Sequence, residues 1–266
     1  MNPGSIDFFI IGPAFLAGIL ILITHIPLGA QVLKRGIVFI DLAIAQIAGL
    51  GVIIAGMAEF EPQGWMVQIA AATAALIGAL LLTWTEQRWP EVQEALIGAL
   101  FVLAATGGIL LLAHNPHGGE HLRDLLAGQI LWVRYQQLLI PGIETVLIVA
   151  AVFFLKDRLN RLGFYLLFAL AITASVQLVG VYLVFASLII PSLGARNYSH
   201  KMRLPLAYLI GVSGYALGLI LSTLFDLPSG ALIVWCLGMI AIFVYAVGSK
   251  KVVLRAGLND GEKQAA

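Results

Sequence analysis

Charged residues divide the sequence into long apolar runs. No Asp, Glu, Lys or Arg occurs from Phe8 to Leu33 or from Pro62 to Thr85. These runs reach the roughly 20 apolar residues that a helix needs to cross a bilayer. Outside the longest uncharged run, the pattern predicts seven membrane spans. The first lies within residues 8–33, and its helix is expected to end near His25 and Pro27. The others are 36–57, 62–85, 95–113, 135–155, 204–225 and 229–248.

The longest uncharged run, Leu162 to Ala195, has 34 residues. At about 1.5 Å per residue it is too long for one untilted crossing and too short for two. Both flanks are basic, and short basic loops face the cytoplasm. We therefore expect the run to go out and come back, bent near Gly180 and interrupted at Pro191, as in broken helices that line cavities. This gives nine crossings, whereas one tilted helix would give eight.

The segment from His114 to Arg134 is polar at its start and has a short apolar part, DLLAGQILWV, between Arg123 and Arg134. We expect a loop followed by a short interfacial or re-entrant helix. The pattern as a whole predicts an all-α integral membrane protein, a polytopic helical bundle of eight to nine transmembrane helices with a short interfacial or re-entrant segment. Residues 1–266 are expected to form a single transmembrane domain.

Composition and charge agree with a membrane protein. Hydrophobic residues make up 61% of the chain and charged residues 11%, against about 25% charged in soluble domains. With the N-terminus outside and the C-terminus inside, 13 of the 15 Lys and Arg residues fall on the cytoplasmic side. The expected location is the bacterial cytoplasmic (inner) membrane, with lipid as a partner and no nucleic acid. Cys236 stands alone, which excludes a disulfide framework or thiolate cluster.

Two sequence patterns bear on enzymatic activity. No Gly-x-x-x-x-Gly-Lys-Ser/Thr phosphate-binding loop is present, and no long polar domain occurs. Ser213 lies in a Gly-x-Ser-Gly pattern, but no histidine follows His200 to serve as its base. We expect a chain that is not an enzyme, so any energy-converting domain must belong to another chain.

Isolated polar groups within the apolar runs are the candidates for a translocation path. Asp41 follows Arg35 by six positions, and a carboxylate inside a bilayer costs a few kcal/mol. It faces either a protein interior or, by snorkelling, the cytoplasmic interface. Glu144 is a second isolated carboxylate. Gln46 lies about 140° from Asp41 around a regular helix, so it either belongs to an irregular helix or serves packing.

Four potential metal ligands fall within eight residues of the polar loop. They are His114, His117, Glu120 and His121. Imidazole nitrogens suit zinc, nickel, copper or iron, and suit manganese less well. The loop is thus a candidate for transient extracellular metal capture, and the alternative is a polar surface loop that binds nothing.

Four segments in register resemble the membrane permeases of zinc and manganese ABC importers. Residues 32–51, VLKRGIVFIDLAIAQIAGLG, are similar to the family's Arg-Arg-Met-Ser-x-x-Gly-Asp-x-Leu-x-His motif. Residues 91–107 resemble its Asp-Thr-x-x-Gly-Ile-x-Phe segment, and residues 122–133 resemble its Tyr-Leu-Phe-Gly-x-Ile-Leu segment. Residues 170–196 are similar to its Val-Gly-x-x-Leu-x-x-x-Leu-Leu-Ile-x-Pro block. The matches occur in the family's order over nearly the whole chain.

The resemblance implies a type II ABC importer permease-like homodimer with a cytoplasmic ATPase, an extracytoplasmic metal-binding protein and no tightly bound cofactor. The family's acidic residue corresponds to Asp41, Ala45 stands in place of its histidine, and Glu94 replaces an Asp. We expect import of a divalent metal, zinc favoured over manganese. Alternatives are a permease for iron chelates or cobalamin, and a stand-alone channel or proton-coupled carrier. The expected ATPase docking residues are Arg158, Arg161, Arg196, Asn197, His200, Lys201 and Arg203.

Overall fold

The structure, a computed structural model, describes residues 8–58, 64–112, 126, 128–154 and 161–264. Helices dominate these ranges, and no β-strand occurs in them. The α-helices are α1 (Phe8–Arg35), α2 (Ile40–Met57), α3 (Trp65–Arg88), α4 (Gln93–Leu112), α6 (Leu139–Phe154), α7 (Arg161–Val179), α8 (Val181–Gly194), α9 (His200–Phe225) and α10 (Ser229–Gln264). Short 3-10 helices occupy Pro90–Val92, Ile130–Trp132 and Tyr135–Leu138.

Most of these helices are long enough to cross a membrane. Within the described ranges, eight helices have the length and apolar character of membrane spans. The shorter helix α8 has 14 residues, or about 21 Å, which falls short of the roughly 30 Å hydrocarbon core. The fold is therefore the predicted multi-pass helical bundle, and α8 is the predicted shorter return segment.

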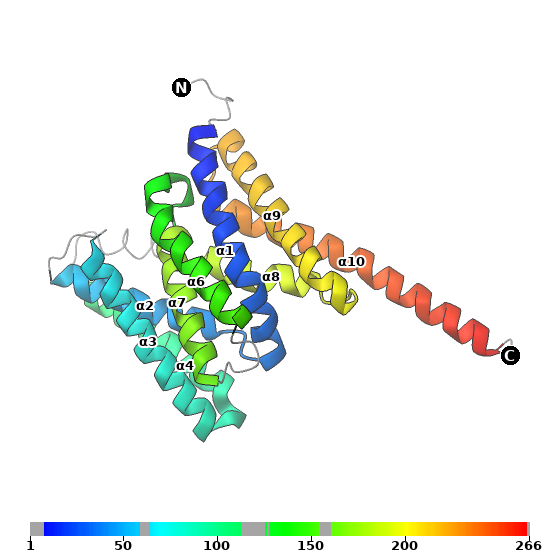
Figure 1. The fold of residues 1–266 in the computed structure, drawn as a ribbon, viewed down its shortest axis with the longest axis horizontal. Coiled ribbons are helices and arrows are strands. Elements are labelled where there is room, and N and C mark those ends of the chain that lie inside the picture. The colour runs from blue at the N-terminus through cyan, green and yellow to red at the C-terminus, as the bar shows by residue number, and fades with distance from the viewer. Residues whose placement is uncertain (1–7, 59–63, 113–125, 127, 155–160, 265–266) are drawn as a thin grey trace.

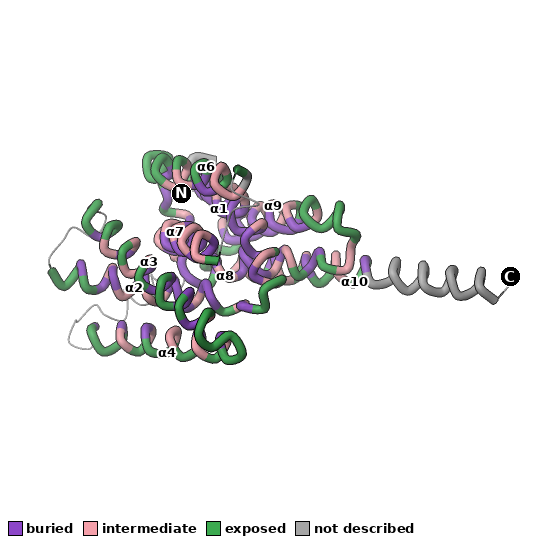
Figure 2. The backbone as a smooth tube through the Cα atoms, turned by 60° about the horizontal axis from the view of Figure 1, so that its bottom comes forward, coloured by how far each residue is buried: buried purple, intermediate pink, exposed green. Residues whose placement is uncertain are grey.

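Helix α1 stands at the centre of the bundle (Figure 1). Helices α2, α3 and α4 pack against one another on one side, whereas α9 and α10 pair on the other. Helix α8 lies between the two groups and contacts α1, α9 and α10. Figure 2 shows buried residues concentrated on α1, α7 and α8, while α4 is largely exposed along its length.

The bend expected in the long uncharged run is confirmed at Gly180. Helix α7 ends at Val179, α8 begins at Val181, and Gly180 between them has a φ of +79°. Only glycine adopts that conformation without a steric penalty. The expected interruption at Pro191 is wrong, because Pro191 lies inside α8 and its carbonyl accepts a hydrogen bond from the N–H of Ala195 (3.1 Å).

Helix α1 also continues through a proline. We expected the first span to end near His25 and Pro27, but the helix runs on to Arg35. Proline has no N–H for the carbonyl four residues earlier, which here belongs to Ile23. The hydroxyl of Tyr208, on α9, donates to that carbonyl instead (3.2 Å). A donor from another helix thus replaces the hydrogen bond that the internal proline cannot make.

The segment before α6 differs from the expectation. Of the short helix expected over residues 124–133, the structure describes residue 126, which is helical, and residues 128–133, which contain the 3-10 turn Ile130–Trp132. Gly128 has a φ of +66° and lies against the α7–α8 break, where a Cβ on it would overlap the carbonyl of Val179. The backbone of the segment therefore lies directly against the break, and the buried side chain of Ile130 packs into the core.

Candidate functional site

A cavity of about 650 Å³ lies among α2, α4, the α7–α8 pair and α10. Its walls are mostly small or branched apolar side chains, with Gln46 as the lining residue that carries an amide. The lining residues are Leu42, Ala45, Gln46, Gly49, Leu50, Ile53, Phe101, Ala104, Ala105, Gly108, Ile109, Leu126, Val176, Val181, Tyr182, Phe185, Ala186, Ile190, Ala231, Val234 and Trp235.

The four sequence segments that carry the family resemblance meet at this cavity. Segment 32–51 supplies one wall through α2, and segment 91–107 supplies another through α4. Segment 122–133 contributes Leu126, and segment 170–196 contributes α7 and α8 on either side of their break. Segments far apart along the chain therefore build one site, which marks the cavity as the candidate functional site.

The start of α2 is held against two of these segments. The ring of Phe39 stacks on that of Phe185, with centroids 6.4 Å apart and an interplanar angle of 4°. The backbone N–H of Phe39 donates to Oε1 of Glu94 (3.4 Å), at the start of α4. Glu94, which replaces the family's Asp, thus positions the turn that leads into Asp41.

Asp41 and Gln46 lie on different faces of α2, as their angular separation predicted. Gln46 lines the cavity, whereas Asp41 does not. Asp41 is 1% exposed and lies in the first turn of α2, where the backbone N–H groups of Asp41 and Leu42 are the donors near its carboxylate, and no described side chain forms an ion pair with it. The side chain of Asp41 therefore lies in the protein interior, at the end of α2 that follows Arg35.

Glu144 lies elsewhere in the bundle. It projects from α6 toward α1 and α7 and lines a small separate cavity with Thr24 and Ser175. None of the residues that line this small cavity also lines the large one. The structure therefore does not bring Glu144 together with Asp41 and Gln46.

The expected extracellular ligands His114, His117, Glu120 and His121 lie outside the described residues, as does Arg158. Among the residues that the structure describes, no group of three or more His, Cys, Asp and Glu side chains is placed to hold a metal ion. The sequence passed over His25, whose ring is fully buried and whose Nδ1 lies 3.0 Å from both the Thr24 hydroxyl and the Ile21 carbonyl. A histidine inside an apolar run is the sequence signal that could have identified His25 as a buried polar residue.

The first of the expected docking residues after α8 lie in a compact turn that packs against α10. Arg196 lies over the ring of Tyr245, 5.4 Å from its centroid, and the Tyr198 hydroxyl donates to the Val244 carbonyl (2.9 Å). We expected a loop up to Arg203, but α9 already begins at His200, so His200, Lys201 and Arg203 are helical. The side chains of these three residues and of Arg196 are exposed, whereas that of Asn197 is half-buried.

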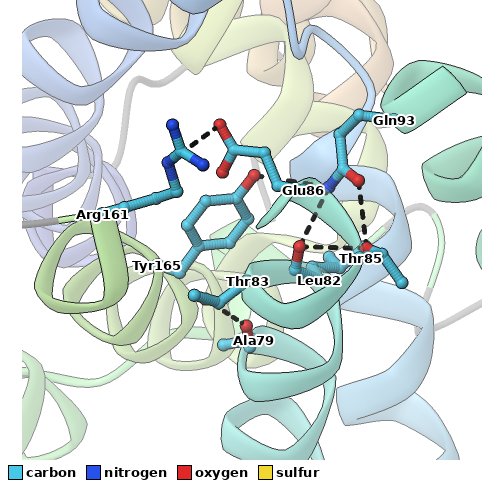
Figure 3. Close-up of polar contacts among 8 residues, drawn as sticks. All are labelled: Ala79, Leu82, Thr83, Thr85, Glu86, Gln93, Arg161 and Tyr165. Atoms are coloured by element: carbon cyan, nitrogen blue, oxygen red, sulfur yellow. Dashed lines mark hydrogen bonds and ion pairs between the residues drawn. The ribbon is translucent and has the colours of Figure 1, made fainter. Parts of the chain in front are cut away.

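Arg161 belongs to a different group of polar contacts. It forms an ion pair with Glu86 at the end of α3, with Nε and Oε1 3.4 Å apart (Figure 3). Beside them Gln93 donates to the Leu82 carbonyl (3.1 Å) and to the hydroxyl of the buried Tyr165 (3.5 Å). The network ties the adjoining ends of α3, α4 and α7 together and was not foreseen, because its members are far apart in sequence.

Comparison with known proteins decides the family. The model of the ABC 3 transport family matches residues 7–161 and 155–248. The chain belongs to the ABC 3 transport family. It is a multi-pass protein of the bacterial inner membrane, a location that the eight apolar helices among its described residues also support.

Individual relatives are similar to this chain over most of their length. The chain is 25% identical to the high-affinity zinc uptake system membrane protein ZnuB of Haemophilus influenzae, over 86% of this chain and 94% of the relative. It is 29% identical to the manganese transport system membrane protein MntC of Halalkalibacterium halodurans, over 91% and 88%. The solved structure of PsaBC from Streptococcus pneumoniae with Fab shares the fold, with a TM-score of 0.70 at 19% identity, over 89% of this chain and 90% of that chain.

Proposed function

We propose that this family member is the membrane subunit of an ATP-driven importer of a divalent metal ion, with zinc favoured over manganese. The observation that carries the proposal is the cavity in which the four resembling segments meet, with Gln46 on its wall and the buried Asp41 on another face of the same helix. The relatives named for zinc and manganese transport support a metal cargo.

The chemistry of the two polar groups suits passage of a dication rather than storage. Asp41 is a buried carboxylate without an ion-pair partner among the described residues, and such a group is costly in a membrane and is relieved by a nearby positive charge. The Gln46 amide oxygen is a neutral, weak ligand on the cavity wall. Weak and separated ligands let an ion enter and leave, which a closed four-ligand site would prevent.

The preference for zinc rests on the histidines of the polar loop. His114, His117 and His121 offer imidazole nitrogens, which zinc binds more readily than manganese does. With Glu120 they would capture the ion outside the membrane. The polar groups on α2 do not separate the two metals, because the amide oxygen of Gln46 on the cavity wall and the carboxylate of Asp41 on another face of the helix both accept either ion.

The partners follow from exposed surfaces. A second copy of the chain would cover the rim of the cavity, where Trp235 is 70% exposed and Tyr182 is 57% exposed. The turn that holds Arg196 and the exposed start of α9 would dock a cytoplasmic ATPase, since both are basic and anchored on α10. Arg158 and Arg161 would add to that surface. An extracytoplasmic metal-binding protein would deliver the cargo.

Uptake of radiolabelled zinc and manganese into proteoliposomes tests the proposal. The vesicles contain the chain with its ATPase and its binding protein, and uptake is measured with and without ATP. We expect ATP-dependent zinc accumulation and little manganese. Asp41→Asn removes the charge at nearly constant volume and should reduce zinc uptake at least about tenfold, the effect of about 1.4 kcal/mol.

Asp226→Asn is the matched control. Asp226 is the exposed cap of α9, and its left-handed conformation (φ +52°) is one that asparagine adopts readily. This variant should import zinc like the unaltered protein. Normal uptake by an Asp41→Asn complex that assembles normally would remove Asp41 from the mechanism. Uptake without an ATPase would show a channel or a proton-coupled carrier.

A second candidate is import of a metal chelate, such as an iron chelate or cobalamin. The width and apolar lining of the 650 Å³ cavity favour it, because an organic ligand gains contacts there that a bare ion does not. The same vesicles distinguish the two. Transport of a labelled ferric chelate or cobalamin, with neither bare metal transported, would replace the first proposal.

A further inference from the structure

The helices fall into two groups, and each helix contacts its own group more extensively than it contacts the other. One group consists of α1, α8, α9 and α10, and the other consists of α2, α3, α4 and α7. We call them the α1 group and the α2 group. Figure 1 shows α2, α3 and α4 on one side of the bundle and α9 and α10 on the other. Helix α6 contacts one helix of each group, α1 and α7, and belongs to neither.

Close backbone contacts hold the helices of each group together. A Cβ on Gly29 of α1 would overlap the Leu188 carbonyl of α8, which belongs to the same group. In the α2 group, a Cβ on Gly51 of α2 would overlap the Ala70 carbonyl of α3. Helices that approach each other this closely through small residues have little room to slide or tilt. Each group is therefore packed as a rigid body.

Polar contacts between helices follow the same division. In the α1 group, the hydroxyls of Ser187 on α8 and Tyr215 on α9 share a hydrogen bond (2.8 Å). In the α2 group, the ion pair of Glu86 with Arg161 and the bonds of Gln93 join α3, α4 and α7 (Figure 3). Among the residues that the structure describes, the side-chain hydrogen bonds and the ion pair that join two different helices all stay within one group. Rotation of one group against the other would break none of them.

The aromatic contacts between the groups do not fix their relative angle. The guanidinium of Arg35, at the end of α1, lies over the ring of Phe164 on α7, 4.3 Å from its centroid. Phe39, just before α2, stacks on Phe185 of α8. Neither contact is a hydrogen bond, and both begin beside the link between α1 and α2. They hold the groups together at this link and let them turn.

The chain passes from one group to the other at two points, and a glycine with positive φ stands at each. Residues 36–39 lead from α1 to α2, and Gly180 joins α7 to α8. The path from α4 through α6 to α7 begins and ends in the α2 group. Gly36 has a φ of +74° and Gly180 has a φ of +79°. Because glycine changes its backbone conformation at low cost, and hinges consist of a few residues at the ends of elements, both passages are suited to be hinges.

The large cavity lies between the two groups. Gln46 lines it from the α2 group, and Tyr182 and Trp235 line it from the α1 group. We propose that the two groups turn as rigid bodies about Gly36 and Gly180, and that this rotation widens and narrows the cavity. Its walls belong to different bodies, so a change in the angle between them changes its width. The inference rests on the proposed function for the ATPase that drives the rotation, and it does not depend on the cargo.

Distances between spin labels in the complex with the ATPase test the inference. Labelled cysteines at Met57 and Phe225, the last residues of α2 and α9, measure the distance between the groups. Labels at Met57 and Arg88 measure a distance within the α2 group, and labels at Phe225 and Phe243 measure one within the α1 group. All four side chains are exposed, and Cys236 is replaced by alanine. Dilution with unlabelled chain restricts the measurement to label pairs within one chain.

The distances are compared without nucleotide and with ATP and vanadate, which stops hydrolysis. The distance between the groups should change by more than about 3 Å, and each distance within a group by less than about 1 Å. An equal change within a group, or no change in any pair of a complex that hydrolyses ATP, would overturn the inference. A complex that shows the expected changes but imports no metal would contradict the proposed function alone.

The chain alone, in lipid nanodiscs, gives a readout that needs no ATPase. A chain that binds no ATPase would contradict the proposed function, but its hinges should still broaden the distribution of the Met57–Phe225 distance. This distribution should be at least about twice as broad as either distribution within a group. Equally narrow distributions in a chain that binds no ATPase would overturn the inference.

A variant of the first hinge tests its position. Gly36→Ala should fold, because an added Cβ meets no atom within 4 Å, but the φ of +74° is strained for alanine. The variant should therefore reduce the nucleotide-dependent change in the Met57–Phe225 distance by at least about twofold. Gly56→Ala is the matched control, since Gly56 lies within α2 and its added Cβ also meets no atom within 4 Å. An undiminished change in Gly36→Ala would show that the groups do not turn about Gly36.

Discussion

The ring of Phe39 lies flat on the ring of Phe185, with centroids 6.4 Å apart and planes 4° from parallel. Phe39 is in the turn before α2, and Phe185 lines the cavity from α8. The contact therefore joins the helix that carries Asp41 to the second half of the broken pair. Any movement of α8 about Gly180 must therefore either separate the two rings or move the start of α2 together with α8.

Truncation of this stack should loosen the coupling of transport to ATP hydrolysis. In Phe39→Ala, α2 and α8 lose their aromatic contact, so the metal imported per ATP hydrolysed should fall about three- to tenfold, the effect of about 0.5–1.5 kcal/mol. Uptake and phosphate release are measured in the same vesicles. Phe225→Ala, at the exposed end of α9, is the control and should keep the original ratio.

Gln46 should contribute directly to cargo passage. Gln46→Leu keeps the volume of the side chain but removes the amide oxygen from the cavity wall, so zinc uptake at limiting concentration should fall about three- to tenfold. The unfolding temperature should stay within a few degrees. Gln68→Leu on the exposed face of α3 is the matched control. Equal uptake by both variants would assign Gln46 to helix packing.

Gly128 should tolerate no side chain. A Cβ at this position would overlap the backbone of Val179 and Gly180, and the φ of +66° disfavours any L-residue. Gly128→Ala should lower stability by more than about 3 kcal/mol and reduce the yield of folded protein. Gly98→Ala, in α4 with open space around the added carbon, should leave Tm unchanged or slightly higher. Melting curves in detergent provide the comparison.

The Tyr208 hydroxyl should stabilise the helix around Pro27. Tyr208→Phe leaves the Ile23 carbonyl without its donor, so the free energy of unfolding should fall by about 1–3 kcal/mol. Tyr135→Phe is the control, because Tyr135 is exposed and should change Tm by less than about 1 °C. A Tyr208→Phe protein with unaltered Tm would show that the helix tolerates Pro27 without this bond.

Sequence patterns were sufficient for the spans because the cost of charge in a membrane acts on each residue separately. The uncharged runs located α2, α3, α4 and the bend at Gly180, and local glycine chemistry explains that bend. The sequence-based predictions were wrong at Pro27 and Pro191, because each proline was interpreted as the end or interruption of a helix. The donor that satisfies the Ile23 carbonyl comes from residue 208, which no local pattern reveals.

The candidate functional site could likewise be predicted from the sequence only in part. The sequence by itself indicated the four segments that resemble the family, and the helical repeat already separated Gln46 from Asp41. Only the tertiary structure decided that four distant segments share one cavity and that Glu144 belongs to another. It also decided that Arg161 pairs with Glu86. These are relations between helices, and they depend on which faces pack together, a choice made by the shape and burial of many side chains at once.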